Sequence, residues 1–147
     1  MKREIYSPFL RSLKDNNKCP NGIFAEETLA QCFSIFLLDK YRQKQLQKCL
    51  IRLVGDNEGV QIHYTKGYSI YEGLNKLLEF SNHLEQNSNC LLAHTWTNSN
   101  LMKLVGVDLL SRHKFTYFKG IPVLQITRSI FREFTRAFNS FDPLENT

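Results

Sequence analysis

The chain has 147 residues, of which 42% are hydrophobic, with a formal net charge of +5. This length and composition exclude a disordered chain and predict one domain over residues 1–147, while the charge favours acidic partners. No apolar run is long enough to cross a bilayer, no apolar stretch follows the basic start, and the four cysteines form no C-x-x-C pair. We therefore expect a cytoplasmic protein with no membrane contact.

The first third of the chain has the pattern of helices. Ser7 followed by Pro8 is typical of an N-cap and a first helical position, and predicts a short N-terminal helix. Residues 15–22 are rich in turn-forming residues and predict a loop. A long helix is then expected over residues 23–54, either continuous or with a break near Tyr41, and the sequence GDNEG ends it.

The rest of the chain alternates between strand and helix patterns. Residues 60–65 (VQIHYT) alternate apolar and polar side chains, which is the period of a half-buried strand. The expected order begins with a strand over 60–65, a helix over 69–83, a strand over 89–96 and a helix capped by Asn98, Ser99 or Asn100. A hairpin of 115–118 and 123–127, a helix over 129–138 and a loose tail over 139–147 follow. The pattern predicts an α/β or α+β domain with a helical first third and a sheet of about four strands.

Two rows of basic residues are the main indication of a partner. On helices, each row recurs at every fourth position opposite an apolar face, and no acidic residue within a row neutralises it. The rows are Lys40, Lys44, Lys48 and Arg52, and Arg128, Arg132 and Arg136. Like charges at this spacing repel, so an acidic ligand would relieve them. A merely solvated helix face explains the rows about as well.

The leading hypothesis is therefore a non-enzymatic binding or regulatory domain, without a cofactor, that docks an acidic partner through these basic faces. Nucleic acid is the first candidate for that partner and an acidic protein surface is the second. A protein-interaction or assembly subunit that uses the aromatic-rich helices is an alternative, and it is compatible with a homodimer.

Few residues point to catalysis. The four histidines have no helical pairing and no nearby cysteine pair, so no metal site is predicted. His94 and Asn98 lie where an expected strand ends beside a helix, and α/β sheets bind ligands at such places. These two residues are the catalytic candidates of an alternative hypothesis, a small-molecule enzyme. A core role for His94 and the nearby Trp96 is the simpler interpretation.

One stretch gives this alternative a more specific form. In CLLAHTWTNSNLMKLVGVDLLSRHKF, an expected strand leads through Trp96-Thr97-Asn98 into a helix that ends before Lys114-Phe115. With the expected order of strand, helix, strand, helix and hairpin from Val60 onward, this arrangement resembles the second half of a GNAT-type acyltransferase and covers roughly half of the chain. The resemblance implies acyl transfer from a coenzyme A thioester near His94. The place of that family's pyrophosphate loop reads TKGYSIYEG here.

Overall fold

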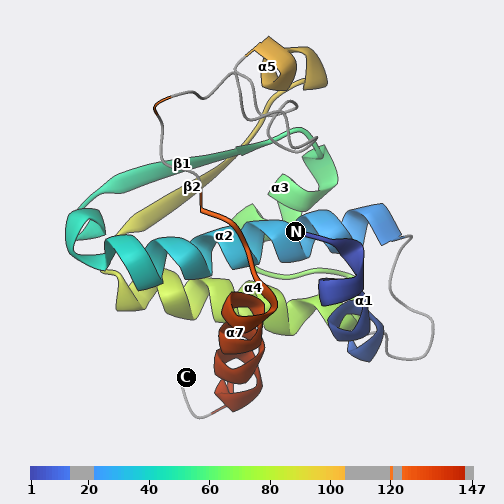
Figure 1. Ribbon diagram of the computed structural model, residues 1–147. Coiled ribbons are helices and arrows are strands. Elements are labelled where there is room, and N and C mark those ends of the chain that lie inside the picture. Colours follow the sequence, from blue (N-terminus) through green and yellow to red (C-terminus); the bar gives the residue numbers. More distant parts are fainter. Residues whose placement is uncertain (14–21, 105–119, 121–123, 145–147) are drawn as a thin grey trace.

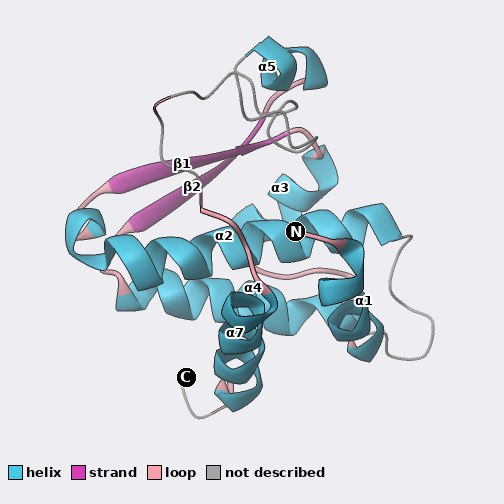
Figure 2. Ribbon diagram, in the orientation of Figure 1, coloured by secondary structure: helices cyan, strands magenta, loops and turns pink. Residues whose placement is uncertain are grey.

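The computed structural model describes residues 1–13, 22–104, 120 and 124–144 (Figure 1). Its elements are α1 (Arg3–Ser12), α2 (Gly22–Leu46), β1 (Leu50–Gly55), α3 (Glu58–Lys66), α4 (Glu72–Asn87), β2 (Leu91–Trp96), α5 (Ser99–Leu104) and α7 (Arg128–Ser140). The strands β1 and β2 pair in parallel, with Leu50 opposite Leu91 and Gly55 opposite Trp96. The sheet lies against a layer formed by α2 and α4, which gives a small α+β domain (Figure 2).

The predicted helix-first layout is confirmed, whereas the sheet of about four strands is wrong for the described residues. The sheet there has two strands, and residues 124–127 are in neither a helix nor a strand. Of the other residues of the predicted hairpin and its turn, Gly120 is described and the rest lie outside the described part. The last helix forms as predicted, but it runs to Ser140, and Phe141 is buried, so the expected loose tail starts later.

Residues 60–65, predicted as a strand, form most of the helix α3. The side chain of Asn57 accepts a hydrogen bond from the Val60 N–H at 3.2 Å and so caps the helix start. Gly67, at a φ of 82°, ends the helix in the left-handed conformation. The buried residues are Val60, Gln61, His63 and Tyr64, which lie on one helical face. The apparent alternation was therefore a helical pattern with polar residues on its buried side.

The long helix predicted over residues 23–54 ends at Leu46, after a kink at Arg42. The chain then turns at Lys48, whose φ is 63° and whose N–H donates to the Asn89 carbonyl at 2.7 Å. Residues 50–55 continue as β1, with alternating exposed and half-buried side chains. A strand fits this apolar segment because pairing with β2 satisfies its backbone and one face packs on the helices.

The first helix also differs from its prediction. It begins at Arg3 and contains Pro8 in its interior, so Ser7 and Pro8 do not open it. The Ser7 hydroxyl donates to the Arg3 carbonyl at 2.7 Å instead of capping the helix. The predicted loop over 15–22 lies outside the described residues except for Gly22, which already starts α2.

The units α2–β1–α3 and α4–β2–α5 repeat one arrangement of helix, turn, strand and capped helix. Lys48 and Asn89 have positive φ at the corresponding turns, and Asn57 and Asn98 cap the following helices. Each of these pairs has the same separation in sequence as the paired positions of the two strands. Because the two strands are parallel, their C-terminal ends lie together at one end of the sheet, and both turns lie at the opposite end.

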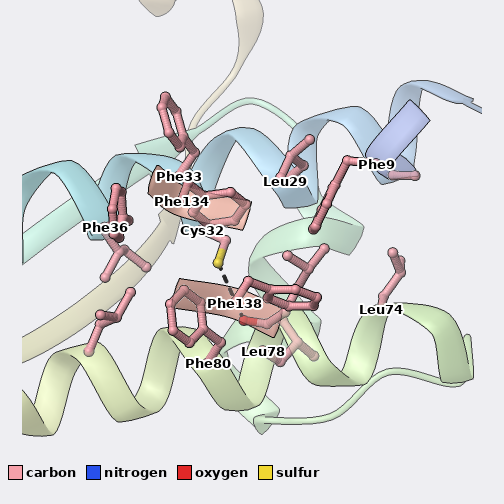
Figure 3. Close-up of a cluster of buried hydrophobic side chains, with 14 of the residues drawn as sticks. Phe9, Leu29, Cys32, Phe33, Phe36, Leu74, Leu78, Phe80, Phe134 and Phe138 are labelled. Atoms are coloured by element: carbon pink, nitrogen blue, oxygen red, sulfur yellow. Dashed lines mark hydrogen bonds between the residues drawn. The ribbon is translucent and has the colours of Figure 1, made fainter. Parts of the chain in front are cut away.

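The core is a cluster of phenylalanines in which α7 packs across α2 and α4 (Figure 3). Phe134 has no exposed surface, and its ring centroid lies between 5.3 and 6.1 Å from those of Phe9, Phe33, Phe36, Phe80, Phe131 and Phe138. These rings come from α1, α2, α4 and α7, so one residue joins helices from both ends of the chain. Among the described residues, none of the helices has both the length and the apolar character that crossing a bilayer requires.

Candidate ligand-binding pocket

A group of hydrogen-bonded polar side chains lies between the sheet and the helices. Gln31 of α2 and Gln61 of α3 exchange two hydrogen bonds, of 3.1 and 2.8 Å, and this exchange couples the orientations of the two amides. The Gln31 Nε2 also lies 2.7 Å from the Nδ1 of His94 on β2. Because this amide nitrogen can only donate, the His94 Nδ1 accepts, and the neutral ring carries its proton on Nε2.

The His94 ring is partly buried and stacks on the Tyr64 ring at a centroid distance of 4.9 Å. Burial lowers the pKa of His94 below its ordinary value, so the imidazole is neutral at pH 7. Its Nε2–H has no hydrogen-bond partner among the residues that the structure describes. His94 therefore offers one neutral donor in a fixed tautomer.

His63, a second histidine, is more deeply buried and is held by Thr28. The Thr28 hydroxyl donates to the Phe24 carbonyl at 2.9 Å, so it accepts from the His63 Nε2 at 3.2 Å. The His63 Nδ1 is buried and has no partner in the described part of the chain. Burial, with a smaller contribution from repulsion by His94, lowers the pKa of His63 to about 4. We interpret His63 as a neutral structural residue behind His94.

A cavity of about 500 Å³ lies between α3, α4 and β2, and we name it the β2 cavity. Its lining includes Tyr64, Thr65, Glu79, Asn82, Glu85 and His94. Tyr64 donates its phenolic hydrogen to the Thr28 carbonyl at 2.7 Å, and burial raises its pKa well above the ordinary value. Tyr64 therefore serves as a fixed wall that supports the His94 ring.

Glu85 is positioned by the edge of β2 that faces away from β1. The Leu91 N–H donates to the Cys49 carbonyl at the β1 side, so the next N–H, of Leu92, points away from β1. The Glu85 Oε2 accepts that N–H at 3.1 Å, and burial raises the pKa of this carboxyl. Glu85 is thus a partly desolvated carboxylate at the wall of the cavity.

The structure separates the catalytic candidates that the sequence grouped at the end of β2. His94 lines the β2 cavity, whereas the Asn98 side chain accepts from the Leu101 N–H at 3.0 Å and caps α5. Trp96 is half exposed, and its Nε1 donates to the Asp56 carbonyl at 3.3 Å. The strand-end site is therefore not assembled as predicted, and the cavity lies on the helix-facing side of the sheet.

Four contributors to the pocket were not identified from the sequence: Gln31, Gln61, Tyr64 and Glu85. Gln31 interrupts the otherwise mainly apolar stretch LAQCFSIF, which is an available signal because a polar residue at a buried position needs a partner. The partners of Gln31 come from α3 and β2, far away in sequence, and no local pattern identifies them.

The first basic row is not a face of one helix. Lys40 and Lys44 lie on α2, Lys48 lies in the turn, and Arg52 lies on β1. Arg128, Arg132 and Arg136 do share the helix α7. Lys40 forms an ion pair with Glu133 of α7, so one residue of the first row contacts the helix that carries the second row.

Acidic residues outside the rows neutralise two of the basic positions. Lys40 pairs with Glu133, and Arg128 pairs with Glu4 at 3.5 Å. Lys44, Lys48 and Arg52 are exposed, and no ion pair with a carboxylate is found for them within the described residues. Partner binding by the rows stays a prediction.

Within the described ranges, no group of three or more His, Cys, Asp or Glu side chains could hold a metal ion. The strand at 60–65, on which the GNAT resemblance depends, is a helix. Comparison of the chain with protein-family models, with curated proteins and with solved structures gave no match. The acyltransferase and assembly-subunit alternatives therefore stay predictions.

Proposed function

We propose that the chain is a small-molecule-binding domain whose ligand occupies the β2 cavity. The observation that carries this proposal is the convergence of His94, Glu85 and Tyr64 on one cavity of about 500 Å³. Burial displaces the pKa of each of these groups from its ordinary value. Cavities of this size that hold such groups are the usual location of binding sites.

The wall offers complementary groups for orienting a ligand. Glu85 is an acceptor, His94 is a neutral donor, and the side chains of Asn82 and Thr65 can donate or accept. Leu78 and Leu92 add apolar surface. Because the Gln31–Gln61 pair holds the His94 tautomer, the donor is in place before a ligand binds, which reduces the ordering cost of binding.

Blocking the cavity should abolish binding. Asn82 is exposed and lines the cavity, so Asn82→Trp fills it from the surface of α4. In a thermal-shift screen of small polar compounds, we expect some to stabilise the wild type, by about 2.7 kcal/mol at a hundred times Kd. The same compounds should not stabilise Asn82→Trp.

The matched control is Gln86→Trp, an exposed change on the same helix outside the cavity lining. It should keep the stabilisation by every compound found with the wild type. Equal stabilisation of Asn82→Trp, or no stabilising compound in the screen, would contradict the proposal.

We propose the docking of an acidic partner, with nucleic acid as the first candidate, as a second function. The observation that favours it is the exposure of Lys44, Lys48 and Arg52 without a carboxylate partner among the described residues. The ion pair from Lys40 to Glu133 joins α2 to α7, the helix that carries the three arginines. Release of counterions from a polyanion would then drive association.

The triple variant Lys44→Gln, Lys48→Gln, Arg52→Gln tests this second function. An electrophoretic shift with a DNA duplex over a salt series should show binding by the wild type that weakens as salt rises, and a shallower salt dependence for the variant. Absence of a shift at low salt, or identical curves for the two proteins, would exclude nucleic acid binding through these residues.

A further inference from the structure

The β2 cavity is acidic although the chain as a whole is basic. Glu79 and Glu85 line it, and no lysine or arginine is among the described residues of its wall. His94 adds no charge, because its imidazole is neutral at pH 7. The net charge of the chain is +5, so the cations are concentrated elsewhere. The charge of this wall complements a cation.

The C-terminal end of α3 adds partial negative charge beside the cavity. Thr65 and Gly67 line the cavity, and α3 ends at Lys66. The last carbonyls of a helix lack partners within it, and the helix dipole places partial negative charge there. The Gly67 N–H satisfies the His63 carbonyl at 2.9 Å. The partial negative charge of this helix end therefore adds to the charge of the two glutamates.

A positively charged neighbour would stabilise the ionised carboxylate of Glu85. Its carboxylate is partly desolvated, and one N–H, from Leu92, is the hydrogen bond found for it within the described residues. A carboxylate can accept several hydrogen bonds, and those from a charged donor are the strongest. An ammonium group beside Glu85 would replace the solvation that burial removes.

We infer that the ligand of the β2 cavity carries a primary ammonium group, held by Glu85 with support from Glu79 and the C-terminal end of α3. The inference rests on the proposed function. A hydrogen-bond acceptor elsewhere on the ligand would meet the Nε2–H of His94. Phosphate-bearing ligands such as nucleotides or coenzyme A are disfavoured, because the described wall offers neither a cationic side chain nor a helix N-terminus.

Two sets of matched compounds test the ligand class by ligand-observed NMR and calorimetry: benzylamine, benzyl alcohol and benzoate, and butylamine, butanol and butyrate. We expect the amine of at least one set to bind about tenfold tighter than its alcohol, with its carboxylate weakest. Glu85→Gln keeps an acceptor for the Leu92 N–H and should remove this preference. Glu79→Gln should reduce it less, and Glu72→Gln, outside the cavity lining, should preserve it.

The outcomes separate this inference from the proposed function. Tighter binding of a neutral or anionic compound, blocked by Asn82→Trp, overturns the ligand class and leaves the proposed function intact. Amine binding that persists in Asn82→Trp overturns the inference, because it then occurs outside the cavity. A preference for the amine over its alcohol that persists in Glu85→Gln also overturns it, because Glu85 then does not hold the ammonium group. Failure of both amines to bind also overturns it, while the compound screen decides the proposed function separately.

Discussion

Replacing Phe134 with alanine should destabilise the protein by about 3–5 kcal/mol, a large part of the stability of a domain of this size. The Phe134 side chain has no exposed surface, and the rings around it come from α1, α2, α4 and α7. Truncation would leave a cavity that several helices would have to close together. Two of them, α2 and α4, also form the layer against which the sheet lies (Figure 2), so such a rearrangement is costly.

Urea unfolding followed by circular dichroism measures this loss. Arg136→Ala is the matched control, because Arg136 is exposed on the same helix, and it should change stability by no more than about 0.5 kcal/mol. A loss below about 1 kcal/mol for Phe134→Ala would show that α7 does not pack into the core as described.

The stability of the protein should fall between pH 6.5 and pH 4 because of His63. In the unfolded chain this histidine binds a proton as the pH falls through its ordinary value of 6.5, whereas burial lowers the folded-state pKa to about 4. The unfolded state therefore binds more protons in this window, and acidification favours it. At about 1.4 kcal/mol per pKa unit the loss is at most about 3 kcal/mol, and solvent screening reduces it to about 2 kcal/mol.

The comparison of the wild type with His63→Gln isolates this contribution. Other groups also respond to pH: the lowered pKa of His94 acts in the same direction, and the raised pKa values of Glu27 and Glu85 act in the opposite one. Urea unfolding at pH 7, 5.5 and 4.5 should show that the wild type loses about 2 kcal/mol more than the variant. Parallel pH dependences would mean that His63 is not held neutral in the fold.

Local sequence signals predicted the elements that depend on local interactions. Asn98 caps α5 and the phenylalanine face of α7 is buried, both as the sequence indicates. The error over residues 60–65 has a tertiary cause: Ile62 is exposed, while Gln61 and His63 are buried because α2 and β2 supply their hydrogen-bond partners. An apolar and polar alternation cannot reveal partners that are distant in sequence.

The site was predicted in part for the same reason. His94 stood out because it lies near the end of an expected strand beside a helix, and it does line the cavity. Glu85 gave no such signal, since a carboxylate near a helix end is ordinary, and its role depends on the edge of β2 that faces away from β1. The row from Lys40 to Arg52 depended on a continuous helix, which the turn at Lys48 interrupts.

The most direct test of the β2 cavity as an amine site is an NMR titration of the ¹⁵N-labelled wild type with benzylamine and butylamine at pH 7. The account predicts His94 as the neutral Nε2–H tautomer before addition. It also predicts that at least one amine shifts the signals of Thr65, Asn82, Glu85 and His94, which line the cavity. Shifts confined to other parts of the chain, no shifts with either amine, or a His94 ring protonated on Nδ1 would contradict it.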